Sequence, residues 1–357
     1  MRIHRGAALP PAHGTATGRA ITIGNFDGVH RGHQAMLALL LNEARHRGLN
    51  SCVVTFEPHP RDFFAQQHQK PELAPARIAT LRDKLAELAR CGVDECVILP
   101  FNASLVAQQA PSFVRDTLWQ GLQARYVLVG DDFRFGSRRM GDYALLDQLG
   151  TELGMDVARM QSYEVHSLRV SSSAVRDALA GGHMQQAAAL LGRPYSISGH
   201  VVHGRKLGRS LGESQAGVGD GFRTLNLRFS HWKPAASGIF AVQVHGLLPH
   251  QPVAGVANLG VRPSLDPTDV NGGRVLLETH CLDWPLAAAD LNGQNEAYGK
   301  LIRVDLLHKL HDELKYDSLA ALTTGIANDC DAVRAFFADH QAQTHTQTRR
   351  QTTRDRI

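Results

Sequence analysis

The hydrophobic pattern of the first half of the chain alternates between two kinds of segment. Short apolar runs with the length of buried strands occur at 20–23, 52–56, 95–99, 126–129 and 156–160. Between them, apolar side chains recur with a helical period at 34–47, 78–90, 112–120 and 143–153. Strands that alternate with helices predict an α/β fold with a mostly parallel, doubly wound sheet. Its ligand site is expected at the carboxyl ends of the strands.

The second half changes to a period of two. After two short helical segments at 172–180 and 183–191, apolar and polar residues alternate at 196–202, 225–229, 239–244, 274–280 and 300–307. Glycine and proline turns separate these runs, which is typical of an antiparallel barrel or sandwich. A last helical segment at 318–337 follows, and the polar tail at 339–357 is expected to be disordered. We therefore expect an N-terminal domain at 15–190 and a C-terminal antiparallel β-barrel with a terminal helix at 191–338.

Composition narrows the class of protein. The chain has 357 residues, 43% hydrophobic and 20% charged, and a net charge of +4 that suits anionic small substrates but is weak for nucleic acid. Its five cysteines are scattered and form no Cys-x-x-Cys pair, so neither zinc nor a disulfide framework is indicated. No apolar run is long enough to cross a membrane or to act as a secretory signal. We expect a cytoplasmic protein without a membrane or nucleic-acid partner.

The first candidate site follows the first strand of the α/β pattern, where the chain reads His30-Arg31-Gly32-His33. Glycines at 24, 28 and 32 allow a ligand to approach the backbone closely, and the N–H groups at the start of the next helix favour phosphate. Two imidazoles beside such a site can stabilise charge on a reacting phosphorus. An isolated His-x-Gly-His is more often a pair of ordinary histidines, because short motifs match by chance. Its place at a strand-to-helix junction favours the phosphate site.

Polar segments also follow other strands of the first half. "TFEPHP" ends the second strand, "VGDDFRFG" the fourth, and "VSSSAVR" opens the next helix. Asp132 could bind a ribose or amine, Ser172 could cap a helix and bind phosphate, and Arg176 could hold a phosphate with two hydrogen bonds. Each residue alone is more often part of a loop or a cap. Their joint position at one edge of the sheet is the stronger argument for a site.

These segments carry a family resemblance. In this order, "IGNFDGVHRGH", "FEPHP", "GDDFRFG" and "SSSAVR" resemble the adenylyltransferase module of the bacterial bifunctional riboflavin kinase/FAD synthetase family. The resemblance implies that His30 and His33 contact the phosphates of ATP and act in catalysis with Arg176. It further implies that Phe56 and Pro58 line the flavin side of the pocket. The ATP site it implies consists of Gly24, Asp27, His30, His33, Asp132, Ser172 and Arg176.

The resemblance extends into the second half, to the riboflavin kinase module. "GHVVHGRKLGRSLG" suits a phosphate-wrapping loop, although a Gly/Lys-rich stretch between strands is usually only a turn. By resemblance, the kinase ATP site consists of Gly204, Lys206, Gly208, Thr224 and Asn226. Thr224 and Asn226 would also hold Mg²⁺ with the nucleotide. The chain departs from the family here: it inserts "ESQAGVGDG" at 213–221 and reads Phe-Arg-Thr-Leu-Asn where relatives read Phe-Pro-Thr-Ala-Asn.

Glu278 in "VLLETHCLDW" stands where the family places its catalytic Glu. On a strand it points to the face opposite to that of its neighbours Leu277 and Thr279. A carboxylate in a pocket can take the proton of a hydroxyl as that hydroxyl attacks a γ-phosphate. A single Glu on a strand is more often part of a solvated face. The resemblance as a whole covers residues 15–338.

The sequence therefore predicts an enzyme with two activities. It would phosphorylate riboflavin with ATP to FMN at residues 191–338 and adenylylate FMN to FAD and pyrophosphate at residues 15–190. Its partners would be ATP, riboflavin and FMN, its cofactor Mg²⁺ with ATP, and its state a monomer or weak homo-oligomer. Two alternatives stay open: a nucleotidyltransferase with a degraded kinase domain, and a non-catalytic flavin-binding regulator. A pure binder has no need of His30, His33, Arg176 and Glu278, and a nucleic-acid role rests only on the basic tail.

Overall fold

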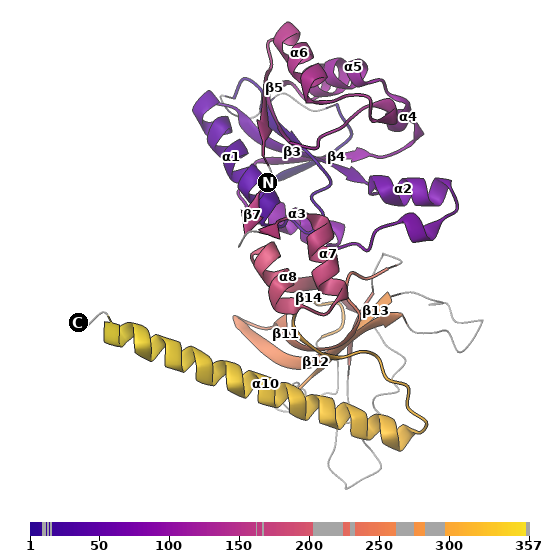
Figure 1. The fold of residues 1–357 in the computed structure, drawn as a ribbon, viewed down its shortest axis with the longest axis vertical. Helices are drawn as coiled ribbons and strands as arrows, with labels where there is room; N and C mark the ends of the chain where they lie inside the picture. The colour runs from indigo at the N-terminus through magenta and orange to yellow at the C-terminus, as the bar shows by residue number, and fades with distance from the viewer. Residues whose placement is uncertain are drawn as a thin grey trace. The chain divides into compact units, whose positions relative to one another are not determined.

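The computed structural model describes residues 1–8, 12, 14, 16–161, 163–165, 168–202, 224–228, 233–261, 275–282 and 297–354 (Figure 1). The chain divides into two compact units. The first contains Met1–Val175 and Leu190–Gly192, and the second contains Arg176–Ala189 and Arg193–Ile357.

The first unit is built on a six-stranded sheet in which every neighbouring pair is parallel. The strand order is β1-β4-β3-β2-β5-β6. From β2 the chain moves to β3 and β4 on one side and then returns to β5 and β6 on the other, so the direction switches between β2 and β5. Ligands bind at such switch points, beyond the carboxyl ends of the strands. The strands are β1 (Arg2–Arg5), β2 (Arg19–Ile23), β3 (Asn50–Glu57), β4 (Glu95–Pro100), β5 (Ala124–Gly130) and β6 (Asp156–Met160).

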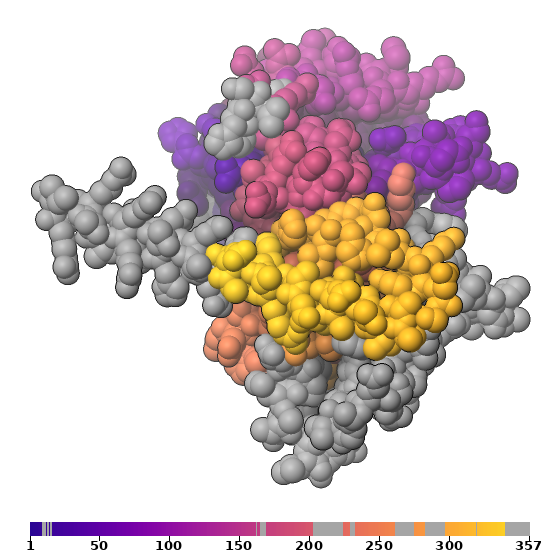
Figure 2. Space-filling view, turned by 60° about the horizontal axis from the view of Figure 1, so that its bottom comes forward, coloured from indigo at the N-terminus to yellow at the C-terminus, as the bar shows by residue number. Residues whose placement is uncertain are grey.

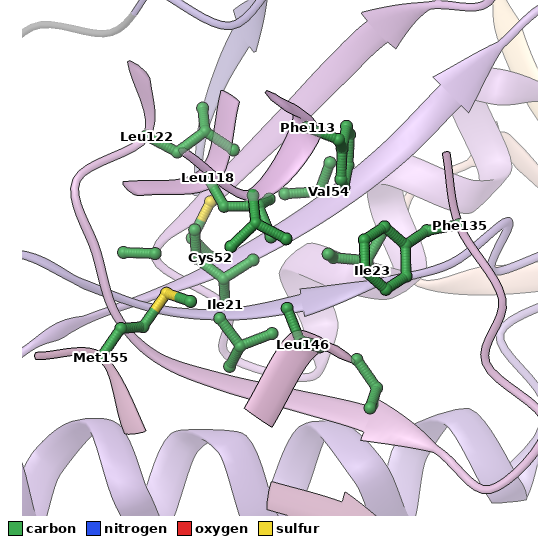
Figure 3. Packing of buried hydrophobic residues seen from close by; sticks show 14 of the residues in the cluster. Ile21, Ile23, Cys52, Val54, Phe113, Leu118, Leu122, Phe135, Leu146 and Met155 are labelled. Atoms are coloured by element: carbon green, nitrogen blue, oxygen red, sulfur yellow. The ribbon is translucent and has the colours of Figure 1, made fainter. Parts of the chain in front are cut away.

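Helices cover both faces of this sheet (Figure 1), which confirms the α/β, doubly wound prediction. Alternate strand residues serve the two faces. On one face Ile21, Ile23, Cys52 and Val54 pack against the helical segments that contain Leu118 and Leu146 (Figure 3). On the other face Val53 packs with Leu37 and Leu88. The helical segments are α1 (Arg31–Arg47), α2 (Pro60–Gln67), η1 (Pro71–Leu73), α3 (Leu81–Arg90), α4 (Ala103–Ala107), α5 (Ala110–Ser112), the π-helix η2 (Phe113–Gly121), η3 (Ser137–Arg139) and α6 (Tyr143–Leu153).

After the sheet, the chain forms a small hairpin of β7 (Glu164–Val165) and β8 (Leu168–Arg169) and then two helices, α7 (Ser172–Ala180) and α8 (Met184–Leu191). The second unit is a closed antiparallel barrel in the order β10-β13-β12-β11-β14-β9, as predicted. Along β13, every second residue is buried, among them Leu277 and Thr279. The barrel strands are β9 (Tyr195–Val202), β10 (Leu225–Arg228), β11 (Gly238–Leu248), β12 (Gln251–Val261), β13 (Val275–Cys281) and β14 (Leu301–His311).

The last helix, α10 (Leu319–Arg354), packs on the barrel. Its residues Ile326 and Val333 join a cluster with Ala241 of β11 and Val256 of β12. Figure 2 shows the described side chains of this helix, in yellow, lying along the barrel strands, in orange. The backbone of α10 is helical through Arg354, and the disorder expected for the tail at 339–357 stays a prediction.

Candidate functional site

The loop between β2 and α1 has an unusual backbone. Phe26 and Val29 have φ angles of 49° and 42°, and Gly28 has 80°. Residues other than glycine rarely adopt this left-handed backbone conformation, so the surrounding structure must hold the loop there. A Cβ at residue 28 would lie 2.6 Å from Cγ2 of Ile78, which only glycine avoids. The loop is thus a tightly specified turn that delivers the chain to His30.

His30 and His33 form one unit at the start of α1. His30 is the N-cap, and its Nδ1 accepts a hydrogen bond of 3.3 Å from the backbone N–H of His33. The two rings stack with centroids 3.6 Å apart and an interplanar angle of 16°. Because Nδ1 of His30 is an acceptor, a neutral His30 carries its proton on Nε2. The arrangement places two imidazoles at a helix N-terminus, where an anion is favoured.

The surroundings of His33 keep it neutral. Burial first, then the neighbouring charges of His30 and Lys84, hold the pKa of His33 well below its usual 6.5. Its Nδ1 is enclosed and finds no hydrogen-bond partner in the described part of the chain. Enclosed polar atoms are nearly always paired in folded proteins, so a group left over at a helix start is a candidate ligand contact.

Asp27 is buried, with 3% of its surface exposed, and its carboxylate accepts from two backbone N–H groups. Oδ1 lies 3.2 Å from both the nitrogen of Ile78 and that of Ala79. Ser172, the first residue of α7, donates from its hydroxyl to the carbonyl of Asp27 at 3.3 Å. The Asp27 side chain therefore ties the loop to the segment that precedes α3, and Ser172 ties it to α7.

The other predicted residues of this site lie at the ends of neighbouring strands. Gly24 closes β2, with its N–H on the carbonyl of Val54 at 3.0 Å. Phe56 is half-buried near the end of β3, Pro58 is exposed just beyond it, and Asp132 is exposed in the turn after β5. All of these positions lie at or just beyond the carboxyl ends of parallel strands. Arg176 lies on α7 one helical turn beyond Ser172, in the part of α7 that belongs to the second unit.

Sequence reasoning missed several residues near this site. The ring of Phe101, after β4, contacts Phe56 edge-on with centroids 5.7 Å apart, and Phe63 and Phe64 of α2 at 5.5 and 5.9 Å. "RDFF" directly after "FEPHP" was the available signal for two of them. The buried Lys84 of α3 was also missed, because a lysine in a helical pattern gives no sign of burial.

In the barrel, strand register gathers three polar side chains. Glu278 of β13 lies directly opposite Asn226 of β10 on one side and Asn258 of β12 on the other. Residues that face one another across strands share a face of the sheet. The amide Oδ1 atoms of both asparagines are enclosed and unpaired among the described residues. Asn226 donates from Nδ2 to the carbonyl of the half-buried Thr224 at 3.2 Å. Asn258 was missed, because it lies opposite Glu278 only through the register of β12 and β13.

Three predicted residues of the kinase ATP site, Gly204, Lys206 and Gly208, lie outside the described residues, as does the insertion at 213–221. Within the described ranges, no three His, Cys, Asp or Glu side chains gather as a metal site. The described helices include none that is long and apolar enough to cross a membrane.

Comparison with known proteins matches both parts of the chain. A family model described as FAD synthetase matches residues 13–174, and one described as riboflavin kinase matches residues 191–337. Curated relatives include bifunctional riboflavin kinase/FMN adenylyltransferases from Escherichia coli (strain K12), 42% identical over 320 residues, and Pseudomonas fluorescens, 41% identical over 339 residues. These alignments cover 90% and 95% of this chain and 93% and 98% of the relatives.

A solved structure has the same fold. The crystal structure described as a macrolide-efflux protein from Streptococcus pneumoniae is similar with a TM-score of 0.69. The similarity covers 94% of this chain and 99% of that one, at 24% sequence identity. At this identity it supports the fold alone.

Proposed function

The chain belongs to the family of bifunctional riboflavin kinase/FMN adenylyltransferases, and on that premise we propose which residues carry each reaction. It phosphorylates riboflavin to FMN with ATP, and it adenylylates FMN with a second ATP to give FAD and pyrophosphate. We assign adenylyl transfer to residues 15–190 and phosphorylation to residues 191–338. The observation that supports the assignment most is the stacked pair of His30 and His33 at the start of α1.

In adenylyl transfer, a phosphate oxygen of FMN attacks the α-phosphorus of ATP, and the bond to the pyrophosphate oxygen breaks. The N–H groups at the start of α1 and the imidazoles of His30 and His33 bind the triphosphate and stabilise the charge that develops on it. Arg176 adds a guanidinium donor and Asp132 binds the ribose or amine of the nucleotide. Phe56 and Pro58 contact the flavin. No side chain is modified, and catalysis consists of positioning and charge stabilisation.

In phosphorylation, the carboxylate of Glu278 accepts the proton of the riboflavin 5′-hydroxyl as its oxygen attacks the γ-phosphorus of ATP. ADP leaves, and FMN is formed. Glu278 is half-buried between Asn226 and Asn258, whose amide oxygens are both unpaired within the described residues. Enclosed polar atoms of this kind are candidate ligand contacts, which supports a substrate site beside the carboxylate.

The donor atoms present fit a magnesium ion. Hard oxygen atoms bind Mg²⁺, which usually takes one or two protein ligands and nucleotide phosphates. The enclosed Oδ1 of Asn226 and the hydroxyl of Thr224 two residues earlier supply such atoms. When bound, Mg²⁺ neutralises phosphate charge on the nucleotide. Gly204, Lys206 and Gly208 would complete the nucleotide loop.

We further propose that the protein is cytoplasmic and acts as a monomer or weak homo-oligomer. All five cysteines are free thiols, and burial raises the pKa of Cys281 to about 12 and of Cys330 to about 11. Unreactive thiols of this kind suit a reducing compartment.

The test is to separate the flavins formed from riboflavin, ATP and Mg²⁺. The wild-type protein should yield FMN and FAD. His30→Ala should lose FAD formation by about 10²–10³-fold and still form FMN. Glu278→Gln should lose FMN formation by about 10²–10⁴-fold and still convert supplied FMN to FAD. Neither product from the wild-type protein, or wild-type FAD formation by His30→Ala, would overturn the proposal.

A further inference from the structure

Lys84 of α3 is a buried cation directly behind the loop that carries the two histidines. Only 2% of its surface is exposed. Its ammonium donates to the carbonyl of Asn25 and to the hydroxyl of Thr55, each at 3.2 Å. A buried ammonium is costly unless it is hydrogen-bonded, so these two hydrogen bonds are what keep the charged side chain of Lys84 in this place.

The carbonyl of Asn25 is held by two donors. Thr55 donates from its hydroxyl to this oxygen at 3.2 Å, and Lys84 donates to both groups. The three groups form a closed triangle beneath the loop. The next residue, Phe26, has the strained φ of 49°. Fixing the orientation of the Asn25–Phe26 peptide therefore fixes the entry into the strained turn.

The segment just before α3 holds the loop at a second point. Asp27 accepts from the N–H groups of Ile78 and Ala79, which lie just before α3, and Lys84 lies one turn inside that helix. Two contacts from one side thus hold a loop whose relaxed conformation would not be left-handed at Phe26 and Val29. His30 follows directly and caps α1, so its position depends on how the loop is held.

The charge of Lys84 also lowers the pKa of His33. It is one of the causes that hold the pKa of His33 low, after burial and the neighbouring His30. Arg77, Glu57 and Asp27 are the charged groups near Lys84 itself, where burial lowers its pKa. A cation placed behind a phosphate loop acts on the loop and its histidines without occupying the anion site.

We propose that Lys84 is a positioning residue for adenylyl transfer, which holds the loop from Asn25 to Val29 so that His30 and His33 meet the ATP phosphates. This inference rests on the proposed function of the first unit. In this role Lys84 does not contact the nucleotide. It acts through the carbonyl of Asn25.

The test measures FMN adenylylation and riboflavin phosphorylation by the full chain. Lys84→Met keeps the length of the side chain and removes the ammonium, and Lys70→Met is the matched control at an exposed lysine of the same unit. A small misplacement of catalytic groups can cost about 10²-fold. We expect Lys84→Met to lower kcat of adenylylation by about 10–10²-fold, with a smaller change in KM for ATP. Phosphorylation, and both activities of Lys70→Met, should stay at the wild-type level.

A double-mutant comparison separates positioning from general destabilisation. If Lys84 acts through the histidines, Lys84→Met and His33→Gln together should cost clearly less than the product of their separate losses. Thr55→Val, which removes the other donor to Asn25, should lower the same kinetic parameter, and it provides the test if Lys84→Met does not fold. Multiplicative losses, or wild-type adenylylation by Lys84→Met or Thr55→Val, would overturn the inference. Absence of adenylylation by the wild-type chain would overturn the proposed function instead.

Discussion

The carboxylate of Asp27 offers a quantitative test of how the histidine loop is held. Asp27→Ala removes the acceptor for the N–H groups of Ile78 and Ala79, which are 3% and 7% exposed. A buried donor left unpaired costs about 1–3 kcal/mol. Two such donors give an expected loss of about 2–6 kcal/mol in the free energy that protects this segment from opening. Asp27→Asn keeps one carbonyl oxygen near both nitrogens and should lose about half as much or less.

The assay is amide hydrogen exchange of the full chain, read on peptides that span residues 76–81. Exchange reports local opening, so the loss should appear first in this segment and in the loop at 24–30. The barrel strands, which belong to the second unit, should exchange as in the wild-type protein, and riboflavin phosphorylation should persist while adenylylation falls. Unchanged exchange at residues 76–81 in Asp27→Ala would show that the two amides do not depend on the carboxylate for protection.

Three further predictions concern single positions. Gly28→Ala should abolish most adenylylation and spare phosphorylation, since a left-handed alanine costs about 1–2 kcal/mol and its Cβ would lie 2.6 Å from Ile78. Wild-type FAD formation by this variant would contradict the described turn. Asn226→Ala should raise KM for ATP in phosphorylation and leave adenylylation unchanged, because Oδ1 supplies an otherwise unpaired acceptor among the described residues; equal KM values in both proteins would show that the nucleotide is held elsewhere. The third concerns His311, whose Nδ1 donates to the carbonyl of Asp312 at 2.7 Å and whose Nε2 donates to Asp329 of α10 at 2.8 Å, which requires a protonated ring. Burial opposes the charge, but these two hydrogen bonds together raise its pKa above 6.5. Because its pKa is raised in the folded state, protonated His311 stabilises the fold fully below about pH 6.5. This stabilisation is lost as pH rises through the pKa of the folded state. Hydrogen exchange of α10 should therefore speed up between pH 6 and pH 8 beyond its intrinsic pH dependence, and His311→Gln should remove that excess.

Most helices and strands could be predicted, because the hydrophobic pattern of each depends only on which of its own faces is buried. The apolar stripe of α1 and the alternation along β13 follow from which face of one element is buried. β1 (Arg2–Arg5) gave no such pattern, since "RIHR" becomes a strand only by pairing with β4, about ninety residues later in the chain. β12 was also absent from the predicted strands, because its glycines and alanines weaken the period-two pattern, although it pairs along its length with β11 and β13.

The same distinction applies to the candidate site. The histidine pair and Ser172 were predicted from short motifs that follow strands, and Glu278 was predicted from the family resemblance. Lys84 and Asn258 were not, because their importance comes from contacts that the sequence does not display. Lys84 donates a hydrogen bond to Asn25, which is 59 positions away in the chain, and Asn258 lies opposite Glu278 only because of the register of β12 and β13.

We propose that the chain carries two separate sites, which are linked by FMN as the product of one and the substrate of the other. The direct test is complementation between two full-length variants, His33→Ala and Glu278→Gln, supplied with riboflavin, ATP and Mg²⁺. Alone, the first should accumulate FMN and the second should leave riboflavin unchanged. Mixed, they should form FAD, because FMN released by the first is adenylylated by the second. Loss of both activities in either folded variant, or a mixture that accumulates FMN without forming FAD, would contradict the account.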